Sequence, residues 1–114
     1  MNAAERRERP RIRFEATVAI HLVTPSKSGN IFEVKGHPIS VQASDINESG
    51  MCLLLEAPVA PQTILKVDFD VAGKPVDVYA RVVWANRDRC GLRFIVLDRI
   101  CCRAIREYIE MESN

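Results

Sequence analysis

Alternation of apolar and polar side chains is the strongest pattern in this chain. Residues 13–23, RFEATVAIHLV, place apolar side chains on one side of an extended segment, from Phe14 to Leu22, and mostly polar ones on the other. The same period of two recurs in 64–71 (ILKVDFDV) and in 76–84 (VDVYARVVW). Such alternation predicts strands with one buried face, and in the last of them Trp84 is expected to point inward with the valines.

Three less regular segments complete the predicted sheet. Near 39–45, ISVQASD, alternate residues from Ile39 to Ala43 are apolar, and Pro38 is expected to separate this strand from the short segment IFEVKG. MCLLLEA, which follows Gly50, is apolar enough for a buried strand, and LRFIVL is predicted as the last strand. Turn-forming residues separate these segments.

The period changes after Asp98. Cys101, Ala104, Ile105 and Tyr108 recur at spacings of three and four, which predicts an amphipathic helix over 98–112. Asp98 is the expected N-cap, because its side chain can accept a hydrogen bond from the first turn of the helix.

Six short strands and one helix predict a mainly β fold. The chain of 114 residues fits one domain, and strands at this spacing are typical of an antiparallel β-barrel. We therefore expect a six-stranded barrel, closed or nearly closed, over 13–114, with the helix packed on one end. Residues 1–12 are expected to form a flexible basic arm.

Positive charge is concentrated in that arm. The net charge of the chain is only +1, yet Arg6, Arg7, Arg9, Arg11 and Arg13 supply five of its 16 cationic side chains. Such a cluster either is a solvated leader or holds an anion. The sequence has no apolar run long enough to span a bilayer and no apolar core of a signal peptide, so we expect a cytoplasmic protein without membrane insertion.

Residue types that carry chemistry are not grouped in the sequence. The four cysteines lack Cys-x-x-Cys spacing and His21 and His37 stand apart, so no metal site is expected. In a reducing compartment the thiols are expected to remain free. No Ser/His/Asp set, paired base or phosphate-binding loop is visible, so we do not expect an enzyme.

A polar turn, DINESG at 45–50, is the second notable motif. Alone, it is ordinary turn chemistry, because Asn and Asp bond to nearby backbone and Gly accepts positive φ. Together with the arginine arm, a strand ending in Val-Val-Trp, the segment Gly-Leu-Arg-Phe and the final helix, it resembles the PilZ domain family of bacterial cyclic di-GMP receptors. That family carries R-x-x-x-R in its arm and (D/N)-x-S-x-x-G after its second main strand. The resemblance covers about residues 6–111 and implies a barrel of the split-barrel type.

The resemblance implies a ligand site formed by both motifs. Arg7 and Arg11 match R-x-x-x-R, although Arg9 and Arg13 offer a second register. In the other motif two positions match, while Asn47 stands where the family has serine. The implied ligand-binding residues are Arg6, Arg7, Arg11, Asp45, Asn47, Gly50 and Trp84.

These residue types suit a ligand with two phosphates and two guanines. Arginine forms bidentate hydrogen bonds to phosphate and to guanine, and it stacks on purines. Asp45 can accept hydrogen bonds from guanine N1–H and N2–H₂, and Gly50 would allow a sharp turn close to the ligand. Asn47 can still donate and accept, but it is bulkier than serine. Trp84 is either a buried aromatic at the barrel end or a stacking partner for guanine.

The function implied by the resemblance is a cyclic di-GMP receptor that is not an enzyme. Binding would order the arm against the barrel and present a changed surface to an unidentified partner protein in motility, biofilm or exopolysaccharide control. One alternative is a PilZ-like interaction module of pilus or motility machinery that does not bind nucleotide. Another is a barrel that binds single-stranded nucleic acid. Aromatic residues are only 6% of the chain and the basic ones lie mainly in the arm, so we expect no nucleic-acid partner.

Overall fold

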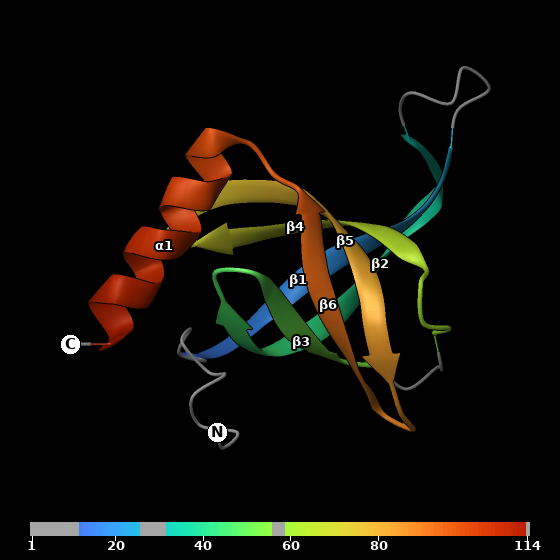
Figure 1. Ribbon diagram of the computed structural model, residues 1–114, viewed down its shortest axis with the longest axis horizontal. Helices are drawn as coiled ribbons and strands as arrows, with labels where there is room; N and C mark the ends of the chain where they lie inside the picture. The colour runs from blue at the N-terminus through green and yellow to red at the C-terminus, as the bar shows by residue number, and fades with distance from the viewer. Residues whose placement is uncertain (1–11, 26–31, 56–58, 114) are drawn as a thin grey trace, which may run out of the picture.

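A computed structural model describes residues 12–25, 32–55 and 59–113 of the chain. Within these ranges lie six strands and one helix, whose bounds are β1 (Ile12–Pro25), β2 (Phe32–Asn47), β3 (Gly50–Leu54), β4 (Ile64–Val71), β5 (Lys74–Ala85), β6 (Arg89–Val96) and α1 (Arg99–Ser113). All strand pairs are antiparallel, and they close a barrel in the order β1-β2-β3-β6-β5-β4. The predicted six-stranded barrel with a C-terminal helix is confirmed (Figure 1). Ile12, which the prediction placed in the arm, is already the first residue of β1.

The barrel interior is filled by the apolar faces that the alternation predicted. All four predicted core residues of β4, from Leu65 to Val71, are buried, and so are Val76, Val78, Ala80 and Val82 of β5. Burial of such side chains is the main favourable contribution to folding, at roughly 1.5–3 kcal/mol each. The register of the barrel therefore follows from which face of each strand is apolar.

Helix α1 closes one end of this core (Figure 1). Its buried residues are Cys101, Ala104, Ile105 and Ile109. Tyr108, predicted to lie on the buried face, is half-buried, and its ring packs edge-on against the buried Phe14, with the ring centroids 5.5 Å apart. No helix in the described ranges is long and apolar enough to cross a membrane.

The predicted break at Pro38 is wrong. Strand β2 runs without interruption from Phe32 to Asn47. Pro38 falls in an irregularity of the β1–β2 ladder, between the pairs Leu22–Lys35 and Ile20–Ile39. On its other side β2 pairs with β3 only from Gln42 onward. A missing N–H is tolerated at such a position, because no regular ladder bond is lost there.

Beyond that irregularity, β1 and β2 leave the barrel as a two-stranded ribbon at the end opposite α1 (Figure 1). Leu22 and Ile39, both predicted to face the core, are each 53% exposed. Leu22 is the last residue of β1 paired with β4, and Ile39 lies where β2 has no partner in β3. The apolar alternation of β1 continues as far as Leu22. It could not reveal that the core ends before the strands do.

The start of α1 provides a test of the predicted cap. Asp98 Oδ1 accepts a 2.7 Å hydrogen bond from the backbone N–H of Cys101, and this bond lowers the pKa of Asp98. We expect Asp98→Ala to lower the melting temperature at pH 7 by roughly 3–8 °C. Asp98→Asn, which keeps a capping oxygen, is expected to melt close to the parent.

The pH dependence separates the charge of this cap from its oxygen. Because the folded pKa is lowered, the charge contributes stability above the unfolded pKa of about 3.9, and this contribution is lost as pH falls through the folded value. Circular-dichroism melts should therefore show any advantage of the parent over Asp98→Asn disappearing as the pH falls through and below the unfolded pKa of about 3.9. Identical melting temperatures for all three proteins at pH 7 would contradict the cap.

Candidate functional site

Two rows of paired residues cross the barrel wall and place the sequence motifs side by side. The first row runs Arg13–Asp45–Cys52–Gly91–Trp84, with one residue from each of β1, β2, β3, β6 and β5. The root of the arm is therefore paired directly with the first residue of the turn motif. The same row continues to the tryptophan at the end of β5.

The second row runs Asn47–Gly50–Arg93–Arg81. In β5, Arg81 and Trp84 are three positions apart, across a register shift. In β2, β3 and β6 the two rows are two positions apart, so on these strands they belong to the same outer surface of the barrel. This surface contains a pocket of about 260 Å³. Its lining residues are Asp45, Asn47, Ser49, Gly50, Met51, Val83, Trp84, Gly91, Leu92 and Arg93.

The pocket gathers four of the seven residues predicted for the ligand site. Asp45, Asn47, Gly50 and Trp84 all line it. Their role in binding stays a prediction. The other three, Arg6, Arg7 and Arg11, lie outside the described residues.

Trp84 lines the pocket because of an irregularity in β5. Its predicted inward orientation is wrong: Val82 is fully buried, whereas Val83 is 43% exposed and Trp84 38% exposed. The β5–β6 register shifts between Val82 and Trp84, and this extra residue turns the tryptophan to the outer face. The indole lies against Gly91, where a Cβ would fall 2.1 Å from its Nε1 atom.

Asn47 holds the turn between β2 and β3. Its Oδ1 accepts hydrogen bonds from the backbone N–H groups of Ser49 and Gly50, at 2.8 and 2.9 Å, and from the Ser49 hydroxyl at 3.1 Å. This is the local bonding expected of an asparagine turn. Because Oδ1 already accepts these three hydrogen bonds, Nδ2 is the group of Asn47 with which the side chain could donate a hydrogen bond to a ligand.

Gly50 is required for a different reason than the sequence suggested. Positive φ angles occur at Gly36 and Gly73, but not at Gly50, so this position does not use the tolerance of glycine for positive φ. A Cβ at Gly50 would instead lie 1.9 Å from the carbonyl oxygen of Leu92. The glycine lets β3 approach β6 closely, and this approach brings the turn motif next to β6.

Arg93 was not among the residues predicted for the site. It belongs to the Gly-Leu-Arg-Phe segment, and its flanking residues Leu92 and Phe94 are buried. Alternation in this segment places Arg93 outside the barrel. Only the β3–β6 register, which pairs it with Gly50, places it in the pocket.

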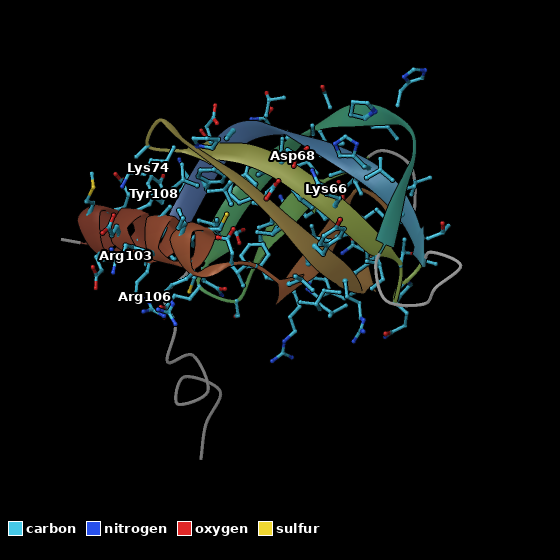
Figure 2. The ribbon with its side chains drawn as sticks, turned by 90° about the horizontal axis from the view of Figure 1, so that it is seen from above. Lys66, Asp68, Lys74, Arg103, Arg106 and Tyr108 are labelled. Carbon is cyan, nitrogen blue, oxygen red and sulfur yellow. The ribbon has the colours of Figure 1, made fainter. Side chains whose placement is uncertain are left out.

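Helix α1 is bonded to both motif-bearing regions. Arg106 Nε donates a 2.7 Å hydrogen bond to Oε1 of Glu48, within the turn. The Tyr108 hydroxyl donates to the carbonyl oxygen of Arg13 at 3.4 Å, at the root of the arm. Figure 2 shows Arg106 and Tyr108 on opposite sides of the helix, with Arg103 on the side of Arg106 and Lys74 on the side of Tyr108.

A second polar cluster lies on another face of the barrel, where β1, β4 and β5 adjoin (Figure 2). Asp68 bonds to His21 Nε2 at 2.8 Å and to Lys66 Nζ at 2.7 Å. Burial alone would lower the pKa of Lys66, but the hydrogen bond and charge of Asp68, with the charge of Asp77, raise it. The charges of this cluster compensate one another. In the described part of the chain, no three His, Cys, Asp or Glu side chains are grouped to hold a metal ion.

Comparison with known proteins gives a family and a fold. The sequence profile of the PilZ domain family matches residues 5–111. The structure is similar to the crystal structure of the PilZ domain of CeSA from a cellulose-synthesizing bacterium, with a TM-score of 0.64 and 13% sequence identity, over 92% of this chain and 99% of that chain. At this identity the likeness concerns the fold alone. No curated protein matches the sequence.

We expect alanine substitutions at the two glycines of the pocket, Gly50 and Gly91, to have different effects on the protein. In Gly50→Ala the obstacle is the Leu92 backbone, so β3 and β6 must separate, and we expect a loss of about 1–3 kcal/mol in the free energy of unfolding. In Gly91→Ala the obstacle is the Trp84 indole, which can rotate away at lower cost. Urea denaturation measures the first effect.

Trp84 is the only tryptophan in the chain, so its fluorescence reports the second effect. Rotation of the indole into water should shift its emission to longer wavelength in folded Gly91→Ala. A Gly50→Ala protein as stable as the parent would contradict the described strand contact, and an unchanged spectrum in Gly91→Ala would contradict the indole position.

Proposed function

The chain belongs to the PilZ domain family, and on that premise we propose that it is a receptor for cyclic di-GMP that acts as an adaptor and not as an enzyme. The observation that carries the proposal is the pocket in which Asp45, Asn47, Gly50 and Trp84 meet. These residues come from three different strands or strand ends. Their meeting matches what a composite nucleotide site requires.

Each pocket residue has a group suited to one part of this ligand. The Asp45 carboxylate can accept from the Watson–Crick edge of guanine, and the flat indole of Trp84 offers a surface for stacking. The guanidinium of Arg93 can bind a phosphate or the O6 and N7 atoms of guanine. The Nδ2 group of Asn47 adds a neutral donor.

The arm is proposed to supply the remaining contacts. A pocket of about 260 Å³ is small for a dinucleotide, so the ligand would also need groups from outside it. Arg13 is paired with Asp45, and the arm therefore joins the barrel at the edge of the pocket. Arg6, Arg7 and Arg11 would reach the ligand from this root. Ordering the arm costs conformational entropy and changes the surface that a partner protein meets.

Isothermal titration with cyclic di-GMP tests this function directly. We expect Arg11→Ala and Asp45→Ala each to lose roughly 1.5–3 kcal/mol of binding free energy, or about 10- to 150-fold in affinity. Arg87→Ala is the matched control, because Arg87 is an exposed arginine in the β5–β6 turn, outside the pocket lining. Cyclic di-AMP and GTP serve as ligand controls.

A thermal-shift measurement distinguishes the alternative. Ligand at 100 times its dissociation constant should stabilise the protein by about 2.7 kcal/mol. If neither heat nor a shift is detected at millimolar cyclic di-GMP, the receptor function is wrong, and the interaction module that does not bind nucleotide is favoured. Equal affinity for cyclic di-AMP would contradict the role of Asp45.

A further inference from the structure

The turn that lines the pocket contains a carboxylate of its own. Glu48 lies between Asn47 and Ser49, both of which line the pocket. Its side chain is 34% exposed and is held by Arg106 of α1 through the 2.7 Å hydrogen bond between Oε1 and Nε. Glu48 stands at a variable position of the D-x-N-x-x-G motif, and Arg106 lies outside both motifs.

The charge of Glu48 affects how well the pocket can accept an anionic ligand. The proposed ligand carries two phosphates, and Asp45 already contributes a carboxylate to the pocket. A second, uncompensated carboxylate in the same turn would repel an anion, with a strength that depends on salt. The Arg106 guanidinium offsets the charge of Glu48 and draws its side chain toward the helix.

We propose that Arg106 is a positioning residue of the pocket, which holds and neutralises Glu48 so that the turn can accept an anionic ligand. The effect on affinity rests on the proposed function, whereas the effect on the turn does not. Arg106 itself is outside the pocket lining. It acts through Glu48.

Through the same contact, α1 would respond to ligand binding in the pocket. The helix bonds the turn through Arg106 and the arm root through Tyr108. If the Arg106–Glu48 pair favours the ligand-bound turn, then ligand must favour the pair by the same factor. The exposed face of α1 beside Arg106 and Arg103 (Figure 2) is thus coupled to the pocket.

The first experiment needs no ligand. Amide exchange with water, measured by NMR on the full chain, reports the Ser49 and Gly50 N–H groups that bond to Asn47. Arg106→Gln, Glu48→Gln and the double variant are expected to exchange faster than the parent at both sites. Arg103→Gln, an exposed arginine on the same side of the helix, should match the parent. Unchanged exchange in Arg106→Gln would overturn the positioning role.

The second experiment is titration with cyclic di-GMP at low and moderate salt. Arg106→Gln should bind about two- to fivefold more weakly, the range expected when one exposed ion pair is broken, and the loss should shrink as salt rises. Glu48→Gln should bind at least as well as the parent. The double variant should return to within about twofold of the parent, because the unpaired carboxylate is gone.

This opposite response separates a charge effect from a merely structural one, which would weaken both single variants alike. A loss in Arg106→Gln that persists in the double variant, or an equal loss in Arg103→Gln, would overturn the proposal. If the parent does not bind cyclic di-GMP but exchange responds as expected, the receptor function fails and the positioning of the turn by Arg106 stands.

Discussion

Close contact between the backbones of β3 and β6 is the constraint on which the pocket depends. The Gly50 Cα lies against the Leu92 carbonyl with no room for a methyl group, and this contact holds the turn motif of β2 and β3 beside β6. From there the paired rows extend to Trp84 and Arg93. A side chain at Gly50 would disturb the pairing of β3 with β6, and with it the position of the turn motif relative to Trp84 and Arg93.

The irregularity in β5 has the complementary effect. A regular strand would have placed Trp84 in the core with Val82, because alternation continues as long as the ladder does. One extra residue at Val83 turns the indole outward, and Gly91 provides the flat surface on which it rests. As a result, the Trp84 ring lines the pocket on the outer surface and is not part of the barrel core.

The two polar regions of the barrel differ in how their charges are satisfied. Around Asp68, a histidine and a lysine lie within hydrogen-bonding distance, so that cluster is compensated from within. In the turn at the pocket, compensation comes from a distant element, since Arg106 reaches Glu48 from the helix. The first arrangement lies within the barrel wall, whereas the second links the β2–β3 turn to α1.

Periodicity alone identified most strands, the helix with its Asp98 cap, and the barrel class, because apolar alternation directly records which face is buried. A turn was also predicted at 45–50, since asparagine bonds to its own neighbouring backbone; the structure has it at residues 48–49, with the flanking residues in β2 and β3. Local patterns failed where a ladder is irregular: at Pro38 the strand continues, and at Trp84 the face changes. Neither irregularity can be predicted from the local sequence, because a bulge depends on how the strand pairs with its partner strand.

The kind of fold thus follows from the order of residues along the chain, and the resemblance to a family supplied the candidate ligand-binding residues. Which of these residues meet is known from the folded structure alone, because cross-strand register is set by packing between strands distant in sequence. It placed Asp45 beside the root of the arm, added Arg93 to the pocket, and joined Arg106 to Glu48. These are long-range contacts, and no local pattern of residues encodes them.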